Sequence, residues 1–186
     1  MNLSRILGTA HNGAQFFLMR KKLIILIFLI GSAFMLCLPL HALQIAAGHN
    51  GPIVLIRLVH PQDTFSLGFI HSVEHCPVWD HIMIDDRYRL VTYATEYWSS
   101  RTGLPYAAFG NEDFSVVGDH FRISNMHRIV PAIYQWVDAR YKNVLCFGDG
   151  TEITLASLAG NTLLVMKLVT VTLYRYLLIQ GQLFFH

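Results

Sequence analysis

The sequence is short of charge and of cysteine. Only 14% of its 186 residues are charged, against about 25% in an average soluble domain, while 53% are hydrophobic. The high hydrophobic content excludes a disordered chain, and the low charge indicates a membrane-associated or secreted protein. The length allows one ordinary domain and a targeting segment.

The sequence also lacks the signatures of nucleic-acid binding and of common enzyme sites. Arg5, Arg20, Lys21 and Lys22 supply four of the 14 lysine and arginine residues, whereas all 12 acidic residues come later. The body is therefore slightly acidic, and we predict no nucleic-acid partner. Neither a nucleophile elbow nor a phosphate-binding glycine loop is present, so no reaction is identified and no cofactor is predicted.

An apolar segment near the N-terminus follows a basic cluster. The 16 residues Leu23–Leu38 come directly after Lys22; this length is at the upper limit of a signal-peptide core and short of the about 20 residues of a membrane span. Ala42 suits signal-peptide cleavage but Leu40 is bulky, so a removed signal peptide and a retained anchor both stay open. Basic residues stay in the cytoplasm, so the body is expected in the periplasm or on the outer face of the cytoplasmic membrane.

From residue 43 on, the pattern favours an all-β fold. We expect an N-terminal extension and signal peptide or anchor over 1–42, a single β domain over 43–180 and a tail over 181–186. The expected strands and hairpins are Ile53–Val59, Phe65–His71, Ile82–Ile84 with Tyr88–Tyr93, and Val144–Phe147 with Glu152–Leu155. Asp-Gly at 149–150 supplies the positive φ that a hairpin turn needs. The sequence predicts a small antiparallel β-sandwich or a partly closed barrel.

Other segments give weaker signals. The β-branched residues of Leu163–Tyr176 favour a long final strand buried on both faces. A helix of one to three turns is allowed near Val130–Arg140, and irregular structure is expected at 99–111 and 124–131. In an oxidising compartment Cys76 and Cys146 either form a disulfide or stay separate buried thiols.

Polar side chains that can bind ligands or metals gather within eleven positions: His71, Ser72, Glu74, His75, Cys76, Asp80 and His81. In a strand, His71 continues the inward row of Phe65, Leu67 and Phe69, and a buried imidazole needs a partner, for which Glu74 is nearest. Such a pair either stabilises the structure, transfers protons, or consists of a metal-binding histidine and a carboxylate that orients its ring. His71, His75, Cys76 and His81 are weak metal candidates, since no closely spaced cysteine pair accompanies them.

Two further features bear on a binding site. Ser72 is next to His71, but adjacent strand residues point to opposite faces, so they do not form a nucleophilic pair. Aromatic residues cluster in sequence around the Thr102–Tyr106 loop, where they either line an apolar pocket or pack in the core. They are Tyr93, Tyr97, Trp98, Tyr106 and Phe109.

The run FSLGFIHSVEHCPV over residues 65–78 resembles the opening signature of a bacterial family known as domain of unknown function 1850. The family's His-Ser-Val-Glu motif falls on His71–Glu74, its acidic position on Asp80, and its Gly-Leu-Pro loop on Gly103, Leu104 and Pro105. Small residues usually precede that loop, whereas this chain has Arg101 and Thr102. The resemblance extends weakly over about Leu43–Val171.

The resemblance implies an accessory role in solute uptake. Genes of similar proteins often neighbour those of tripartite ATP-independent periplasmic (TRAP) transporters that use a TAXI-type solute-binding protein. We therefore expect a non-enzymatic extracytoplasmic domain that binds a transporter subunit, a solute-binding protein or a small solute near His71, Ser72, Glu74, Asp80 and Gly103–Pro105. The alternatives are a metal-dependent or acid–base enzyme using His71, Glu74 and Asp80, and a structural envelope protein.

Overall fold

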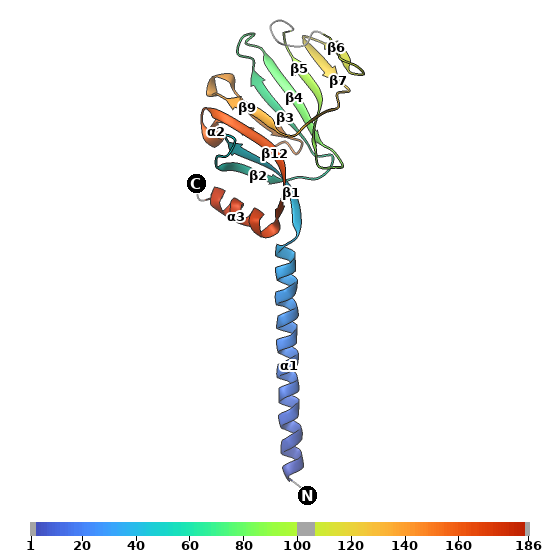
Figure 1. Cartoon of the computed structure of the whole chain (residues 1–186), viewed down its shortest axis with the longest axis vertical. Helices are drawn as coiled ribbons and strands as arrows, with labels where there is room; N and C mark the ends of the chain where they lie inside the picture. The colour runs from blue at the N-terminus through green and yellow to red at the C-terminus, as the bar shows by residue number, and fades with distance from the viewer. Residues whose placement is uncertain (1–2, 100–106, 185–186) are drawn as a thin grey trace.

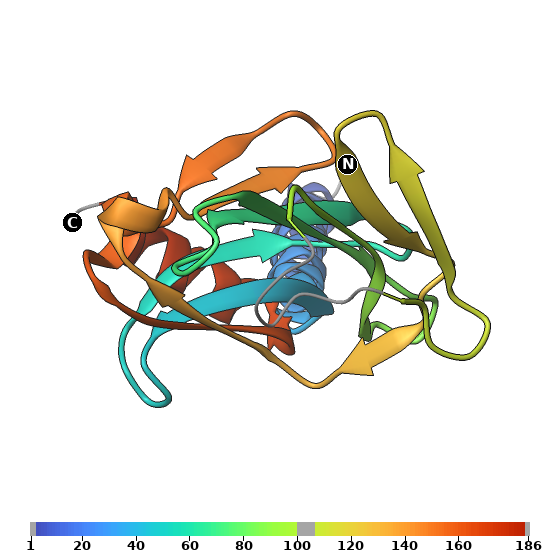
Figure 2. The same ribbon diagram turned by 90° about the horizontal axis from the view of Figure 1, so that it is seen from above.

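The computed structural model describes residues 3–99 and 107–184, with side chains from residue 19 on. Two antiparallel sheets form the body (Figure 1 and Figure 2). The small sheet has the order β2 (Ile53–Leu58), β1 (Pro39–Ala47), β12 (Thr162–Thr172) and β9 (Ile133–Val137). The large sheet has the order β11 (Glu152–Thr154), β10 (Val144–Phe147), β3 (Thr64–Ile70), β4 (Pro77–Ile84), β5 (Leu90–Tyr97), β7 (His120–Ser124) and β6 (Asp113–Val117), with β8 (Arg128–Val130) beside β5.

The main hydrophobic core lies where the two sheets face each other. Leu43 and Ile45 of β1 and Leu164 of β12 come from the small sheet, and Leu67 and Leu145 come from the large one. Each is at most 2% exposed. Alternate side chains of each strand thus meet across the interface. The predicted all-β fold is confirmed, and of the two forms expected it is the two-sheet one, because the sheets do not close into a barrel.

Both predicted hairpins are confirmed. β4 pairs with β5, and β10 pairs with β11. In the first turn the Asp85 carboxylate accepts hydrogen bonds from the backbone amides of Arg87 and Arg89. In the second, Gly150 has φ +87°, a left-handed conformation in which a glycine avoids strain. These short-range interactions are readable from the sequence.

The predicted long final strand is confirmed as far as Thr172, but other sequence predictions of secondary structure are wrong. The final strand ends at Thr172 and is followed by helix α3 (Leu173–Phe184), and Lys167 and Thr170 are exposed, so β12 is not buried on both faces. Where a helix was allowed, β9 is followed only by the single 3-10 turn Ala139–Tyr141. The β6–β7 hairpin and the four-residue helix α2 (Ala156–Ala159) were not foreseen. Pairing with β1 holds β12 extended, and this constraint ends at Thr172.

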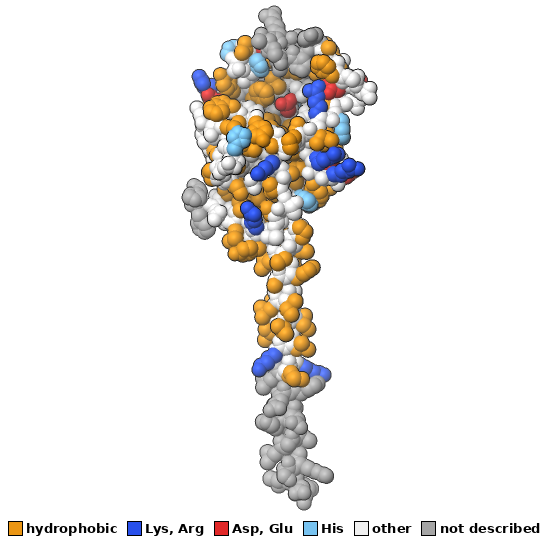
Figure 3. Space-filling view, viewed as in Figure 1, with side chains coloured by type: hydrophobic (Ala, Val, Ile, Leu, Met, Phe, Trp, Pro, Cys, Tyr) orange, Lys and Arg blue, Asp and Glu red, His pale blue; other side chains and the backbone are white. Residues whose placement is uncertain are grey.

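The N-terminal helix α1 (Leu3–Leu36) projects from the body and leads into β1 through Cys37 and Leu38 (Figure 1). Most side chains of α1 above the basic cluster at 20–22 are apolar and exposed (Figure 3). Within residues 3–99 and 107–184, no helix combines the length and the apolar character needed to cross a membrane. Helix α3 contacts α1 and lies at the same end of the body.

Candidate functional site

The turn between β3 and β4 contains most of the predicted site residues. Strand β3 ends at Ile70, so His71 does not continue the inward row of the strand, as the sequence had indicated. The backbone amide of His71 instead donates to the Cys76 carbonyl at 2.8 Å, and the amide of His75, at φ +51°, donates to the His71 carbonyl at 2.9 Å. Two backbone hydrogen bonds therefore close the turn.

The side chains of His71 and Glu74 have different roles in this turn. The Nδ1 atom of His71 accepts a hydrogen bond of 3.1 Å from the backbone amide of Glu74. The imidazole therefore stabilises the turn that contains the His-Ser-Val-Glu motif. The Glu74 carboxylate accepts a hydrogen bond of 2.7 Å from the hydroxyl of Ser99, which follows β5. Ser72 is exposed on the turn. Gly103, Leu104 and Pro105, and also Tyr106, lie outside the described residues.

Asp80 points toward the inner face of the large sheet. It is in register with Leu67 on β3 and Thr95 on β5, and the Thr95 hydroxyl donates to its carboxylate at 2.8 Å. Burial raises the pKa of the Asp80 carboxyl, and this effect exceeds the opposing effects of the Thr95 hydrogen bond and of the nearby His81 and Arg128. The charged form of Asp80 is thus disfavoured by folding.

We expect Asp80→Asn to stabilise the protein at neutral pH. A carboxyl whose folded-state pKa is raised contributes stability below its unfolded pKa and loses it as the pH rises through the folded value. Asparagine carries no charge, so it does not lose this stability as the pH rises. Its side-chain oxygen still accepts the hydrogen bond from the Thr95 hydroxyl. The melting temperature of the variant should exceed that of the parent at neutral pH, and the gap should shrink as the pH falls toward 4. A lower melting temperature at neutral pH would contradict this account.

His81 follows Asp80 on β4 and therefore points to the opposite, outer face. Its Nδ1 lies 2.7 Å from the hydroxyl of Ser66 on β3, and its Nε2 lies 3.6 Å from the carboxylate of Glu96 on β5. Burial lowers the pKa of His81, and the charge of Arg122 adds to this, against the opposing effect of Glu96. Among the described atoms its Nε2 has no hydrogen-bond partner. Burial and the charge of Arg122 therefore favour the neutral form of the ring.

Glu96 links this cluster to the edge of the large sheet. Its carboxylate accepts a 2.7 Å hydrogen bond from Arg122 on β7 and lies 4.0 Å from the Nε2 of His120. The His120 ring stacks on Trp98 with centroids 4.6 Å apart. The Ser66–His81–Glu96 cluster thus crosses three adjacent strands on one face. The sequence did not predict this cluster. It predicted the pairing of β4 with β5, but the cluster also requires the pairing of β3 with β4.

The cluster has the order of a hydrolase triad but a different setting. A serine hydroxyl next to an imidazole, with a carboxylate near the other ring nitrogen, resembles an activated nucleophile. Ser66, however, lies in the middle of β3, which pairs with strands on both sides, so its backbone is used by the sheet. Acyl transfer needs amide donors aimed at the developing oxyanion. The position of Ser66 within a strand paired on both sides therefore does not favour acyl transfer.

The metal candidates do not converge in the structure. His71, His75 and Cys76 belong to the turn, whereas His81 lies within β4 on its outer face. Among residues 3–99 and 107–184, no group of three or more His, Cys, Asp or Glu side chains is placed to hold a metal ion.

Cys76 and Cys146 are both free thiols, so of the two states left open for them they adopt the unpaired one. Cys146 is in register with Ser66, whereas Cys76 lies just beyond the pairing of Ile70 with Pro77. Five strand positions at about 3.3 Å each separate the two cysteines by roughly 16 Å along the sheet. A disulfide requires Cα atoms closer than about 7 Å.

The predicted aromatic cluster is divided between core and surface. Tyr97 is fully buried with Val78, Ile123 and Met126, and its ring stacks on Phe121. Phe109 is 68% exposed. Tyr97 therefore packs in the core, and Phe109 is available for contact with another molecule.

The fold and the site define an antiparallel two-sheet β domain with a polar turn at one end of the larger sheet. Residues 65–155 match the model of a family described as Domain of unknown function (DUF1850), so this part of the chain is similar to that family. The range runs from the second residue of β3 to just past β11, so it holds the large sheet except Thr64, together with β9, while β1, β2 and β12 lie outside it. Neither the curated proteins nor the solved structures searched contained a match.

Proposed function

We propose that this protein is an extracytoplasmic accessory domain of a TRAP-type solute transport system with a TAXI-type solute-binding protein. In this role it binds a protein partner through the turn that carries His71, Ser72 and Glu74. The basic and apolar N-terminal segment supports delivery across the cytoplasmic membrane. The family resemblance supports the association with a transporter.

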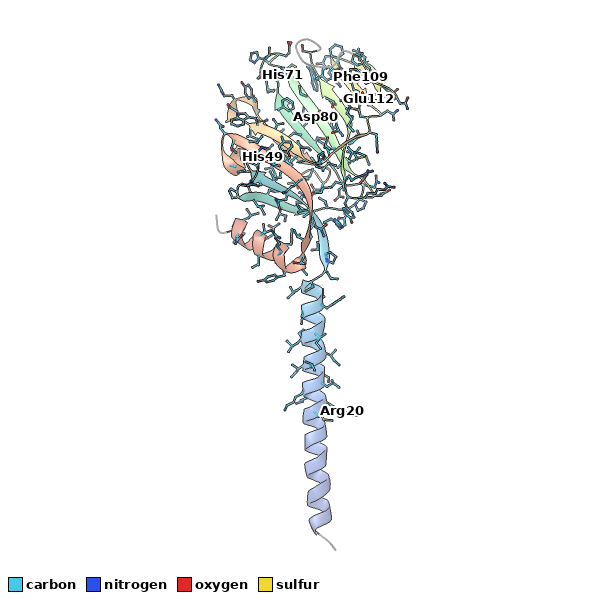
Figure 4. All side chains as sticks on the ribbon, viewed as in Figure 1. Arg20, His49, His71, Asp80, Phe109 and Glu112 are labelled. Atoms are coloured by element: carbon cyan, nitrogen blue, oxygen red, sulfur yellow. The ribbon has the colours of Figure 1, made fainter. Side chains whose placement is uncertain are left out.

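The observation that carries this proposal is the position of the turn. His71 and Phe109 lie at the end of the body farthest from α1 (Figure 4). If α1 holds the base of the body toward the membrane, this distal end faces the aqueous compartment, where a soluble partner is found.

The distal end also exposes apolar side chains. Val73 on the turn is 59% exposed, Phe109 is 68% exposed, and Val116 of β6 is 64% exposed. Apolar side chains grouped at one end of a small domain are typical of a protein interface. The polar atoms of Glu74, Ser72 and His71 beside them supply hydrogen bonds for its rim.

Cross-linking in cells followed by purification tests the proposal. A photo-reactive amino acid at Val73 should cross-link to a transporter subunit or to the solute-binding protein, identified by mass spectrometry. The same amino acid at Tyr134, which is 57% exposed on β9, is the matched control and should give no such product. Recovery of this protein alone from gently solubilised membranes, under several detergents and without a cross-link at Val73, would count against the proposal.

A second candidate function is acid–base chemistry, and the Ser66–His81–Glu96 cluster is the observation that favours it. The residues His71, Glu74 and Asp80, first considered for this role, have separate described contacts in the turn and on β5. His81→Gln separates the two functions. Under the binding proposal it keeps cross-linking at Val73, whereas an enzyme using this cluster would lose turnover of its substrate while still folding.

A further inference from the structure

Helix α3 has apolar side chains on two opposite sides. One side packs on the small sheet, where Ile179 joins a cluster with Ala42, Ile56 and Val171. The amide of Gln180 fixes this side by donating to the Ile56 carbonyl at 2.8 Å. On the opposite side Tyr174, Leu177 and Leu178 are each at least half exposed. A helix that is apolar on both sides is normally buried on both sides.

The exposed side of α3 lies next to the point where α1 leaves the body. The backbone amide of Leu173, the first residue of α3, donates to the carbonyl of Leu38 at 3.1 Å, in the connection between α1 and β1. α1 points away from the body and α3 runs across its base (Figure 1). The apolar surface of α1 and that of α3 therefore meet at the base of the body (Figure 3).

A groove beside α3 contains two basic side chains. Lys167 of β12 and Arg175 of α3 line a groove of about 420 Å³ on the outer face of the small sheet, together with His49. Neither Lys167 nor Arg175 forms an ion pair with any residue that the structure describes. Cations beside an apolar helix face match a surface that offers hydrocarbon and anionic headgroups together.

We propose that α3 lies on the outer surface of an anionic lipid bilayer, with Tyr174, Leu177 and Leu178 in the headgroup and acyl-chain boundary. A second copy of the chain fits this surface less well. The 12 residues of α3 offer a strip about 18 Å long and about 10 Å wide, which is far below the about 800 Å² that each partner buries in a standard protein interface. The proposal extends the proposed function to a lipid partner and does not depend on the transporter association.

Fluorescence of a label on α3 tests this proposal. The full chain, with its three native cysteines replaced by alanine and Leu178→Cys introduced, carries an environment-sensitive NBD fluorophore in nanodiscs of phosphatidylcholine with phosphatidylglycerol. We expect the emission to be blue-shifted and severalfold more intense than that of the same labelled protein unfolded in urea without detergent. Lipids that carry a nitroxide near the headgroup should quench it. The matched control carries the label at Asp119, at the distal end, and should stay water-like and unquenched.

The other outcomes would overturn the proposal. An unshifted emission at position 178, with native circular dichroism, would show that α3 faces water. A blue shift that is insensitive to nitroxide lipids and grows with the number of chains per disc would show that a second copy covers α3. The discs contain no transporter subunit. A negative result for α3 therefore does not affect the proposed function, which the cross-linking at Val73 tests separately.

Discussion

A chain that begins at residue 43 is expected to be less stable than one that begins at residue 38, by about 2–4 kcal/mol. Residues Pro39–Ala42 are the first part of β1 and pair with Val169–Thr172 of β12. Ala42 also pairs with Leu58 of β2 and is fully buried. Losing this part of the ladder removes several backbone hydrogen bonds at about 1 kcal/mol each. Urea unfolding followed by circular dichroism measures the difference.

The same comparison bears on the fate of the N-terminal segment. Cleavage after Ala42 would remove four residues from a strand that lies between β2 and β12. A large difference between the two chains would therefore favour a mature protein that keeps Pro39–Ala42. Equal free energies of unfolding would show that the start of β1 is dispensable and that cleavage after Ala42 is tolerated.

The substitution Leu145→Ala should lower the free energy of unfolding by about 2–5 kcal/mol. Leu145 is fully buried on β10, in register with Leu67 and Ile153, and belongs to the core between the two sheets. Truncation of this side chain leaves a cavity. The neighbouring strands do not close the cavity, because their backbone hydrogen bonds hold them in place. Thermal and urea unfolding both report this loss.

The matched control is Leu177→Ala on α3. Leu177 is 52% exposed in the isolated protein, and exposed substitutions of this kind usually change stability by less than about 0.5 kcal/mol. Similar losses for the two variants would contradict the assignment of Leu145 to the main core.

Local signals in the sequence were sufficient for the hairpins. The β4–β5 turn depends on Asp85, whose side chain satisfies amides two and four residues away, and the β10–β11 turn depends on Gly150. Neither interaction needs a distant partner. The alternation of Phe65, Ser66 and Leu67 likewise identified the strand and its inner face.

The Ser66–His81–Glu96 cluster needed information that the sequence does not display. The pairing of β4 with β5 shifts after His81, which is opposite Ala94, while Ile82 is opposite Thr92. Tyr93 is the extra residue of this bulge. Without the bulge, residues 94–97 would change faces, and Glu96 would no longer share a face with His81. One inserted residue thus decides which polar groups meet.

Helix α3 was missed for a different reason. The β-branched run of β12 continues into a segment rich in Leu and Tyr, and composition alone does not mark where the strand stops. The end is set by tertiary structure, because β1 offers pairing partners only as far as Pro39, opposite Thr172. Beyond that point the chain satisfies its backbone locally as a helix.

The placement of the distal end outside the cytoplasmic membrane is tested most directly by a membrane-impermeant maleimide. Asp119 in the β6–β7 turn is 84% exposed at its side chain, so Asp119→Cys, in a chain with its native cysteines replaced by alanine, presents a reactive thiol. We predict labelling in cells whose outer membrane alone is permeabilised, while a cytoplasmic cysteine protein in the same cells stays unlabelled. Labelling that appears only after the cytoplasmic membrane is broken would contradict the account.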